Sequence, residues 1–143
     1  MNSKLLRPSS DTVHSISLVL LEGDYSVCRF EPKTRIPPLS GPSDTYSLTT
    51  THLETSLVCS TVAVPAGGRT DSGWRVLYVE GPIPFDLTGV IAGITSAVAA
   101  AGLPVFVLST FDSDLLLLRG ESLDKAIAAL NGSGYLVATP AIM

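Results

Sequence analysis

The sequence is poor in charged residues and lacks any cluster of basic ones. Asp, Glu, Lys and Arg make up only 15% of the 143 residues, whereas 45% are hydrophobic. This balance excludes a disordered chain, which has high charge and few apolar residues. The net charge is −4 and the nine basic residues are scattered, so we expect no nucleic-acid partner. The low charge also predicts that another copy of the chain, or another protein, covers part of the surface.

The sequence also has few side chains that could bind a metal or carry redox chemistry. Its two cysteines, Cys28 and Cys59, lie far apart, whereas zinc sites and redox motifs have cysteines a few residues from each other. Both occur in segments with strand character, so we predict buried free thiols. His14 and His52 are likewise isolated in the sequence. We therefore expect neither a metal site nor a cofactor.

The longest stretch without a charged residue runs from Leu87 to Phe111. A helix over residues 87–101 would span ~23 Å, which is short of the ~30 Å hydrocarbon core of a membrane. Gly102 and Pro104 would end such a helix, and no Lys or Arg flanks it as an interfacial anchor. The stretch therefore predicts a buried core helix and no membrane partner.

The first residues do not have the pattern of a secretion signal. Lys4 and Arg7 precede the apolar segment Ile16–Leu21, which is too short for the apolar core of a signal peptide and ends at Glu22. We therefore expect a cytoplasmic protein.

Residues 1–72 are predicted to form a mostly β part. β-branched and alternating residues predict strands, and Gly23-Asp24 predicts a tight turn that joins the first two strands as a hairpin. Prolines make residues 31–44 irregular, and glycines make residues 65–73 a turn-rich link to the second part. The expected strands cover residues 15–21, 25–30, 46–52 and 54–61.

Residues 73–143 are predicted to form an α+β part. From Leu87 onward, apolar residues recur at intervals of three and four, which is typical of a helix that buries one face. Asp86 is well placed to cap that helix, and Ser122 to cap a second one. The resulting βαββαβ order is that of a ferredoxin-like fold. The expected elements are strand 74–80, helix 86–101, strand 104–109, strand 114–119, helix 122–131 and strand 135–139.

From Trp74 onward, and most clearly between Gly73 and Leu118, the sequence resembles the ACT domain. The residues that carry the resemblance are Asp-Leu-Thr-Gly-Val at the start of the helix, residues 86–90, and Ser-Thr-Phe-Asp-Ser-Asp after the next strand, residues 109–114. The similarity is to the subgroup found in short two-part microbial proteins and in the animal cytosolic arginine sensors.

The first part of the chain also resembles the degenerate leading half of those two-part proteins, most clearly at residues 25–29 and 56–59. The resemblance therefore implies a ferredoxin-like βαββαβ ACT domain over residues 73–143. A degenerate, mostly β ACT-like half over residues 1–72 would precede it, with the two sheets adjacent.

The resemblance implies a non-enzymatic regulatory module that binds a small amino acid where two ACT domains meet. N–H groups at the helix start suit the ligand carboxylate, and a glycine there lets the backbone come close to it. The acidic turn suits the ammonium group. A homo-oligomer, or another regulatory protein as partner, is implied as well. The implied ligand-binding residues are Asp86, Gly89, Val90, Ile91, Thr110, Phe111, Asp112 and Asp114.

Other interpretations of these residues stay open. Asp112 and Asp114 are also common turn formers, and Asp86 is first of all a helix cap. The sequence has no evident acidic pair dedicated to a guanidinium group, so arginine is not implied as the ligand. The fold could instead serve only for association with other proteins. Ser122 begins a Ser-x-x-Lys sequence of the kind found in acylating serine enzymes, but a helix start favours a capping role.

Overall fold

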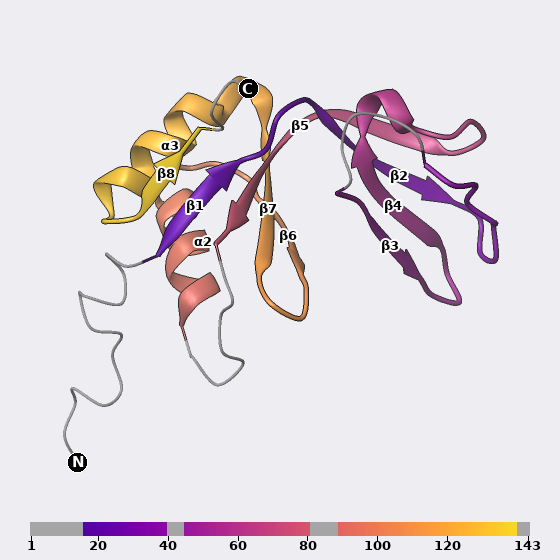
Figure 1. Ribbon diagram of the computed structural model, residues 1–143, viewed down its shortest axis with the longest axis horizontal. Helices are drawn as coiled ribbons and strands as arrows, with labels where there is room; N and C mark the ends of the chain where they lie inside the picture. The colour runs from indigo at the N-terminus through magenta and orange to yellow at the C-terminus, as the bar shows by residue number, and fades with distance from the viewer. Residues whose placement is uncertain (1–15, 40–44, 81–88, 140–143) are drawn as a thin grey trace, which may run out of the picture. The chain divides into compact units, whose positions relative to one another are not determined.

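The computed structural model describes residues 16–39, 45–80 and 89–139 (Figure 1). Contacts divide the chain into two compact units. The described residues 16–21, 76–80 and 89–139 form the helical unit, and the described residues 22–39 and 45–75 form the strand unit. The predicted boundary between a degenerate ACT-like half, residues 1–72, and an ACT domain, residues 73–143, stays a prediction.

The helical unit combines a sheet with two helices (Figure 1). Its strands have the order β6-β7-β5-β1-β8, in which β1 and β8 are parallel. From β5 onward the elements follow the predicted order βαββαβ, which confirms the α+β, ferredoxin-like class. The elements are β1 (Ser17–Leu20), β5 (Arg69–Val79, shared with the strand unit), α2 (Val90–Ala100), β6 (Phe106–Ser109), β7 (Asp114–Arg119), the 3-10 turn η3 (Gly120–Ser122), α3 (Leu123–Gly132) and β8 (Leu136–Ala138).

The core of the helical unit lies between its helices and one face of its sheet. Val90, Ile94 and Val98 recur every four residues along α2 and are buried. They belong to one apolar cluster with Leu77 and Val79 of β5. Burial of three such side chains contributes about 4–9 kcal/mol before conformational entropy is subtracted. The buried residues that α3 adds to the cluster are Leu123, Ala126 and Leu130.

The strand unit is an antiparallel sheet in the order β3-β4-β2-β5. Its elements are β2 (Tyr25–Phe30), β3 (Ser47–Thr50), β4 (Thr55–Ser60), the 3-10 turn η2 (Thr61–Ala63) and the first residues of β5. Cys28 and Cys59 are buried and free, as predicted, in a cluster with Phe30 and Leu57. Burial raises the pKa of both thiols, that of Cys59 to about 11 with a further contribution from Cys28.

The hairpin predicted at Gly23-Asp24 is wrong. β1 pairs antiparallel with β5 and parallel with β8, whereas β2 pairs with β4 and β5. Gly23 does adopt the left-handed conformation of a turn, with φ 85°. Because β1 and β2 both pair antiparallel with consecutive parts of β5, the chain is not reversed at this position. The partners of a strand depend on where its apolar side chains can be buried. Leu18 and Leu20 of β1 are buried in the core of the helical unit.

The glycine-rich link predicted over residues 65–73 is also wrong in its second half. β5 already begins at Arg69 and continues through Gly73 without a break. Gly73 has φ 90°, and the pairing of β2 with β5 shifts register between Tyr25 and Val27. This glycine therefore belongs to an irregularity of the β-bulge type inside a strand, which needs the same residue type as a loop.

The first helix of the ACT-like part begins later than predicted. The N-cap of α2 is Gly89, so the predicted capping role of Asp86 is wrong for this helix; Asp86 itself lies outside the described residues. Gly89 has φ 84°, a left-handed conformation that cannot continue into a right-handed helix. Among the described residues, every helix falls short of the length and apolar character that crossing a membrane requires.

Candidate functional site

The start of α2 presents backbone N–H groups, and its N-cap residue does not cap them with a side chain. Gly89, as N-cap, makes no side-chain hydrogen bond, and the first turn carries no acidic residue. The first intrahelical bond runs from the N–H of Gly93 to the carbonyl of Gly89, at 2.9 Å. The N–H groups between these residues therefore have no acceptor within the helix. Together with the helix dipole they can hold a carboxylate.

The three residues predicted at this helix start differ in exposure. Gly89 is exposed, so its backbone is accessible to a ligand. Val90 is only 7% exposed and belongs to the core cluster, and Ile91 is half-buried against that cluster. Val90 therefore holds the helix on the sheet, whereas Gly89 and Ile91 can contribute surface.

The turn between β6 and β7 is fixed by its own hydrogen bonds. The Thr110 N–H donates to the Ser113 carbonyl at 2.8 Å, and the Ser113 N–H donates to the Thr110 hydroxyl at 3.0 Å. The Thr110 hydroxyl also donates to the Ser113 carbonyl at 3.1 Å. Ser113 is buried, and its own hydroxyl donates to the carbonyl of Val79 in β5. The acidic turn is therefore tied to the strand that leads toward α2.

The two aspartates of this turn have different surroundings. Asp114 is half-buried and accepts a hydrogen bond of 2.6 Å from the hydroxyl of Ser109, its partner in the β6–β7 ladder. One carboxylate oxygen of Asp114 is thus engaged, and the other keeps acceptor capacity. Asp112 is exposed, and Phe111 is 79% exposed at the tip. The turn therefore offers carboxylate oxygens beside a large apolar ring.

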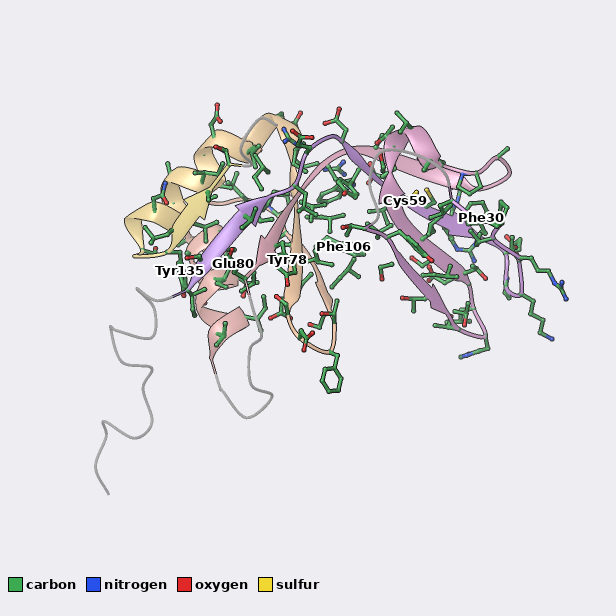
Figure 2. The ribbon with its side chains drawn as sticks, in the orientation of Figure 1. Phe30, Cys59, Tyr78, Glu80, Phe106 and Tyr135 are labelled. Atoms are coloured by element: carbon green, nitrogen blue, oxygen red, sulfur yellow. The ribbon has the colours of Figure 1, made fainter. Side chains whose placement is uncertain are left out.

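The helix start and the acidic turn lie toward the same end of the helical unit (Figure 1). β5, which contains Tyr78, ends toward that same side, and Glu80 follows its last residue (Figure 2). Glu80 is exposed, and its backbone N–H donates to the Ser17 carbonyl of β1 at 2.9 Å. Seven of the eight predicted ligand-binding residues thus belong to two segments of one unit, and the eighth, Asp86, lies outside the described residues.

The position of α2 also depends on two residues that sequence reasoning missed. A Cβ atom added at Gly93 would lie only 2.5 Å from the hydroxyl oxygen of Tyr135, so the absence of a side chain lets the helix approach this ring. Tyr135 is 4% exposed, and burial raises its pKa. The only sequence signal for this contact was a glycine inside an otherwise regular helical pattern.

The described residues hold little that could perform covalent chemistry. No group of three or more metal-ligating side chains occurs among them. Ser122 is the N-cap of α3 but makes no side-chain capping hydrogen bond, and Lys125 is exposed on the same helix. The arrangement at the end of the helical unit suits binding of a molecule that carries a carboxylate and an ammonium group.

Comparisons with known proteins point to one family. A family model described as the ACT domain matches residues 69–132. A crystal structure of an Agobacterium tumefaciens protein is 33% identical, covers 89% of this chain and 95% of its own, and superposes with a TM-score of 0.80. A Vibrio cholerae protein of unknown function gives a TM-score of 0.67 at 16% identity, covering 92% of this chain and 97% of its own.

The fold is shared with the regulatory subunit of aspartate kinase from Thermus thermophilus, in its ligand-free form. That structure gives a TM-score of 0.57 at 12% identity and covers 81% of this chain and 95% of its own. At this level of identity the likeness concerns the fold.

Proposed function

Because the chain belongs to the ACT domain family, we propose that it is a non-enzymatic regulatory module that binds a small amino acid where two ACT domains meet. One observation carries the proposal: the helical unit combines a helix start whose N-cap, Gly89, makes no side-chain hydrogen bond with an acidic turn at Asp112 and Asp114. These two segments complement the two charged groups that every free amino acid carries.

In the proposed complex, the ligand carboxylate accepts hydrogen bonds from the N–H groups of the first turn of α2. The ammonium group faces Asp112 and the remaining oxygen of Asp114. Phe111 covers the ligand side chain, which accounts for a large aromatic ring with 79% exposure in the free protein. A small or aliphatic side chain can pack against the Phe111 ring in this arrangement.

The proposal includes the subgroup of short two-part proteins to which the animal cytosolic arginine sensors belong. Its support is the residue pattern at positions 86–90 and 109–114 and the mostly β strand unit, which corresponds to a degenerate leading half. In this arrangement the ACT domain covers residues 73–143 and the degenerate half residues 1–72.

A thermal-shift screen with the twenty common L-amino acids tests the function. We expect one or a few of them to raise the melting temperature, with dissociation constants of about 1 µM to 1 mM, a range suited to metabolite pools. The hit should bind at least about tenfold more weakly to Asp114→Asn, which loses the charge that faces the ammonium group. Asp24→Asn, at an exposed aspartate of the strand unit, is the matched control and should bind normally. Absence of any hit, or undiminished binding by Asp114→Asn, contradicts the proposed site.

A second candidate function is association without a ligand. Among the described strands β6 pairs only with β7, and Val107 on β6 is 37% exposed. An uncharged, partly apolar edge strand of this kind favours pairing with another chain. A dimer whose dissociation constant in sedimentation experiments is the same with and without every amino acid would favour this candidate over a sensor.

A further inference from the structure

The strand unit contains an open hollow of about 450 Å³. It lies where β2 ends and β5 begins, and all of its lining residues belong to the strand unit. Its volume is within the range of small-molecule sites. The lining residues are Arg29, Phe30, Glu31, Gly67, Gly68 and Arg69.

Two arginines oppose each other across this hollow. Arg29 of β2 and Arg69 of β5 are direct partners in the antiparallel ladder, so their side chains leave the same face of the sheet. Like charges in directly opposite positions repel each other and destabilise a sheet. Such a pair needs either a neutralising side chain or an anion that both guanidinium groups can share.

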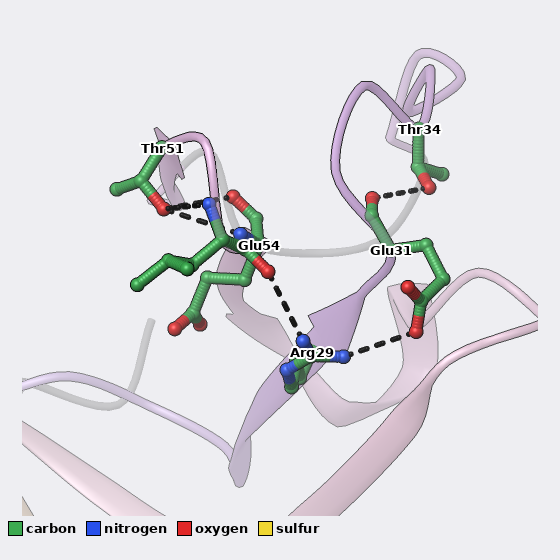
Figure 3. Close-up of polar contacts among 6 residues, drawn as sticks. Arg29, Glu31, Thr34, Thr51 and Glu54 are labelled. Carbon is green, nitrogen blue, oxygen red and sulfur yellow. Dashed lines mark hydrogen bonds and ion pairs between the residues drawn. The ribbon is translucent and has the colours of Figure 1, made fainter.

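The guanidinium group of Arg29 is already held in one orientation (Figure 3). It donates to the Leu53 carbonyl at 3.1 Å and to the Glu31 carboxylate at 3.2 Å. The Glu31 side chain is 82% exposed, so this ion pair is weakly held. A guanidinium group has five N–H donors, and these two bonds leave others for a further acceptor.

Arg69 is exposed and forms no ion pair within the described residues. The lining therefore carries two positive charges and one negative charge, and the negative one is already engaged with Arg29. Among the described residues, the charge of Arg69 therefore has no partner within ion-pair distance.

Two glycines, Gly67 and Gly68, precede Arg69 in the lining of the hollow. A Cβ atom added at Gly68 would lie 2.7 Å from the ring of Phe30 and 2.9 Å from the Arg29 carbonyl, so any side chain here would collide. Gly67 has φ 99°, a conformation that L side chains rarely adopt. Phe30 is 3% exposed and packs in the core of the strand unit. The hollow thus has the backbone of Gly67 and Gly68 and two cationic side chains, whereas the Phe30 ring points to the opposite face of the sheet from the arginines.

We propose that this hollow is a binding site for a small anion that bears a carboxylate or phosphate group, held jointly by Arg29 and Arg69. The planar guanidinium fork matches both kinds of oxyanion, and the shared anion removes the repulsion between the two arginines. The site is independent of the amino-acid site proposed in the helical unit, because it shares no residue with that site.

Titrations with inorganic phosphate and with succinate, followed by ¹H–¹⁵N NMR of the arginine Nε–H groups at constant ionic strength, test the proposal. We expect saturable shifts of the Arg29 and Arg69 signals with at least one of the two anions, and comparing the anions shows which group the site prefers. Binding should weaken at least about tenfold in Arg69→Gln. Arg69→Lys, which keeps the charge and loses the fork, should be intermediate. Arg35→Gln is the matched control, because Arg35 is exposed nearby and does not line the hollow.

The free protein supplies a second readout. Without an added anion, Arg69→Gln should melt at the same temperature as the wild type or higher, because one of two opposed charges is gone. With a saturating anion the order should reverse. Non-saturating shifts with both anions, equal binding by Arg69→Gln, or a lower melting temperature of this variant without anion would overturn the proposal.

Discussion

Replacement of Gly93 by alanine tests how α2 is held in the position that presents Gly89. The new Cβ would lie 2.5 Å from the hydroxyl oxygen of Tyr135 and 3.8 Å from its ring carbon Cζ. The contact with the hydroxyl oxygen is a collision, whereas the contact with Cζ is an ordinary van der Waals contact. The cost of the substitution therefore depends on this one oxygen atom. Because Tyr135 is buried at 4% exposure, its ring cannot simply turn into solvent.

Two opposing effects set the size of the change. Alanine in a helix interior is more favourable than glycine by about 1 kcal/mol. Forcing an extra atom into a packed core costs about 1–3 kcal/mol. We therefore expect Gly93→Ala to lower the free energy of unfolding by about 0–2 kcal/mol. In a Tyr135→Phe background the collision is absent, and the same substitution should raise it by up to about 1 kcal/mol.

Urea denaturation followed by circular dichroism at the helix band provides the assay, because both described α-helices belong to the helical unit. The four proteins of the double-mutant cycle should give a coupling of about 1–3 kcal/mol. Gly132→Ala is the control, since a Cβ at Gly132 meets nothing within 4 Å, and it should be neutral or stabilising. Gly93→Ala that stabilises the wild-type background as much as the Tyr135→Phe background would refute the reasoning.

Three further predictions concern stability, pH and the exposed turn. Ser113→Ala should cost about 1–3 kcal/mol in urea unfolding, because the Val79 carbonyl loses its buried donor; a cost near zero would contradict that bond. The Cys59 pKa is raised by burial to about 11, so its contribution to stability is complete below pH 9 and is lost as pH rises through 11. From pH 8 to pH 10.5, the urea midpoint of unfolding should therefore fall further in the wild type than in Cys59→Ala. Equal falls in the two proteins would contradict the raised pKa of Cys59. Phe111→Ser should change the free energy of unfolding by less than about 0.5 kcal/mol, as expected for an exposed side chain, yet weaken binding of an amino-acid hit.

Local patterns predicted most elements of the helical unit. β7 spans Asp114–Arg119 as expected, and the turn before it has the Thr110–Ser113 hydrogen bonds of a tight turn. α3 begins after Ser122 and ends at Gly132, where a capping residue and a glycine indicated its limits. These features depend on residues that are neighbours in the chain, so the sequence is enough to find them.

The errors have a common physical cause. Gly23 and Gly73 were predicted in turns and Gly89 at a close approach to a ligand, and all three adopt positive φ. The same conformation serves a turn, a bulge and a helix cap, so the residue type alone does not distinguish them. Asp86 likewise had the chemistry of a cap, but the left-handed Gly89 begins the helix after it.

The candidate site was predictable only in part. The family pattern named Gly89, Thr110 and Asp114 from their order in the sequence. The bonds that hold the turn, from Ser109 to Asp114 and from Ser113 to Val79, were missed because serine is common in turns and carries no distinctive signal.

The sequence by itself determined the proportion of charged to hydrophobic residues, the order of the elements and the family. Each of these depends on composition or on residues close together in the chain. Only the tertiary structure decided that β1 lies between β5 and β8, that Gly93 meets Tyr135, and that Arg29 faces Arg69. These contacts join residues far apart in the chain. They are selected by which apolar faces can be buried together, and only the folded chain as a whole satisfies that condition.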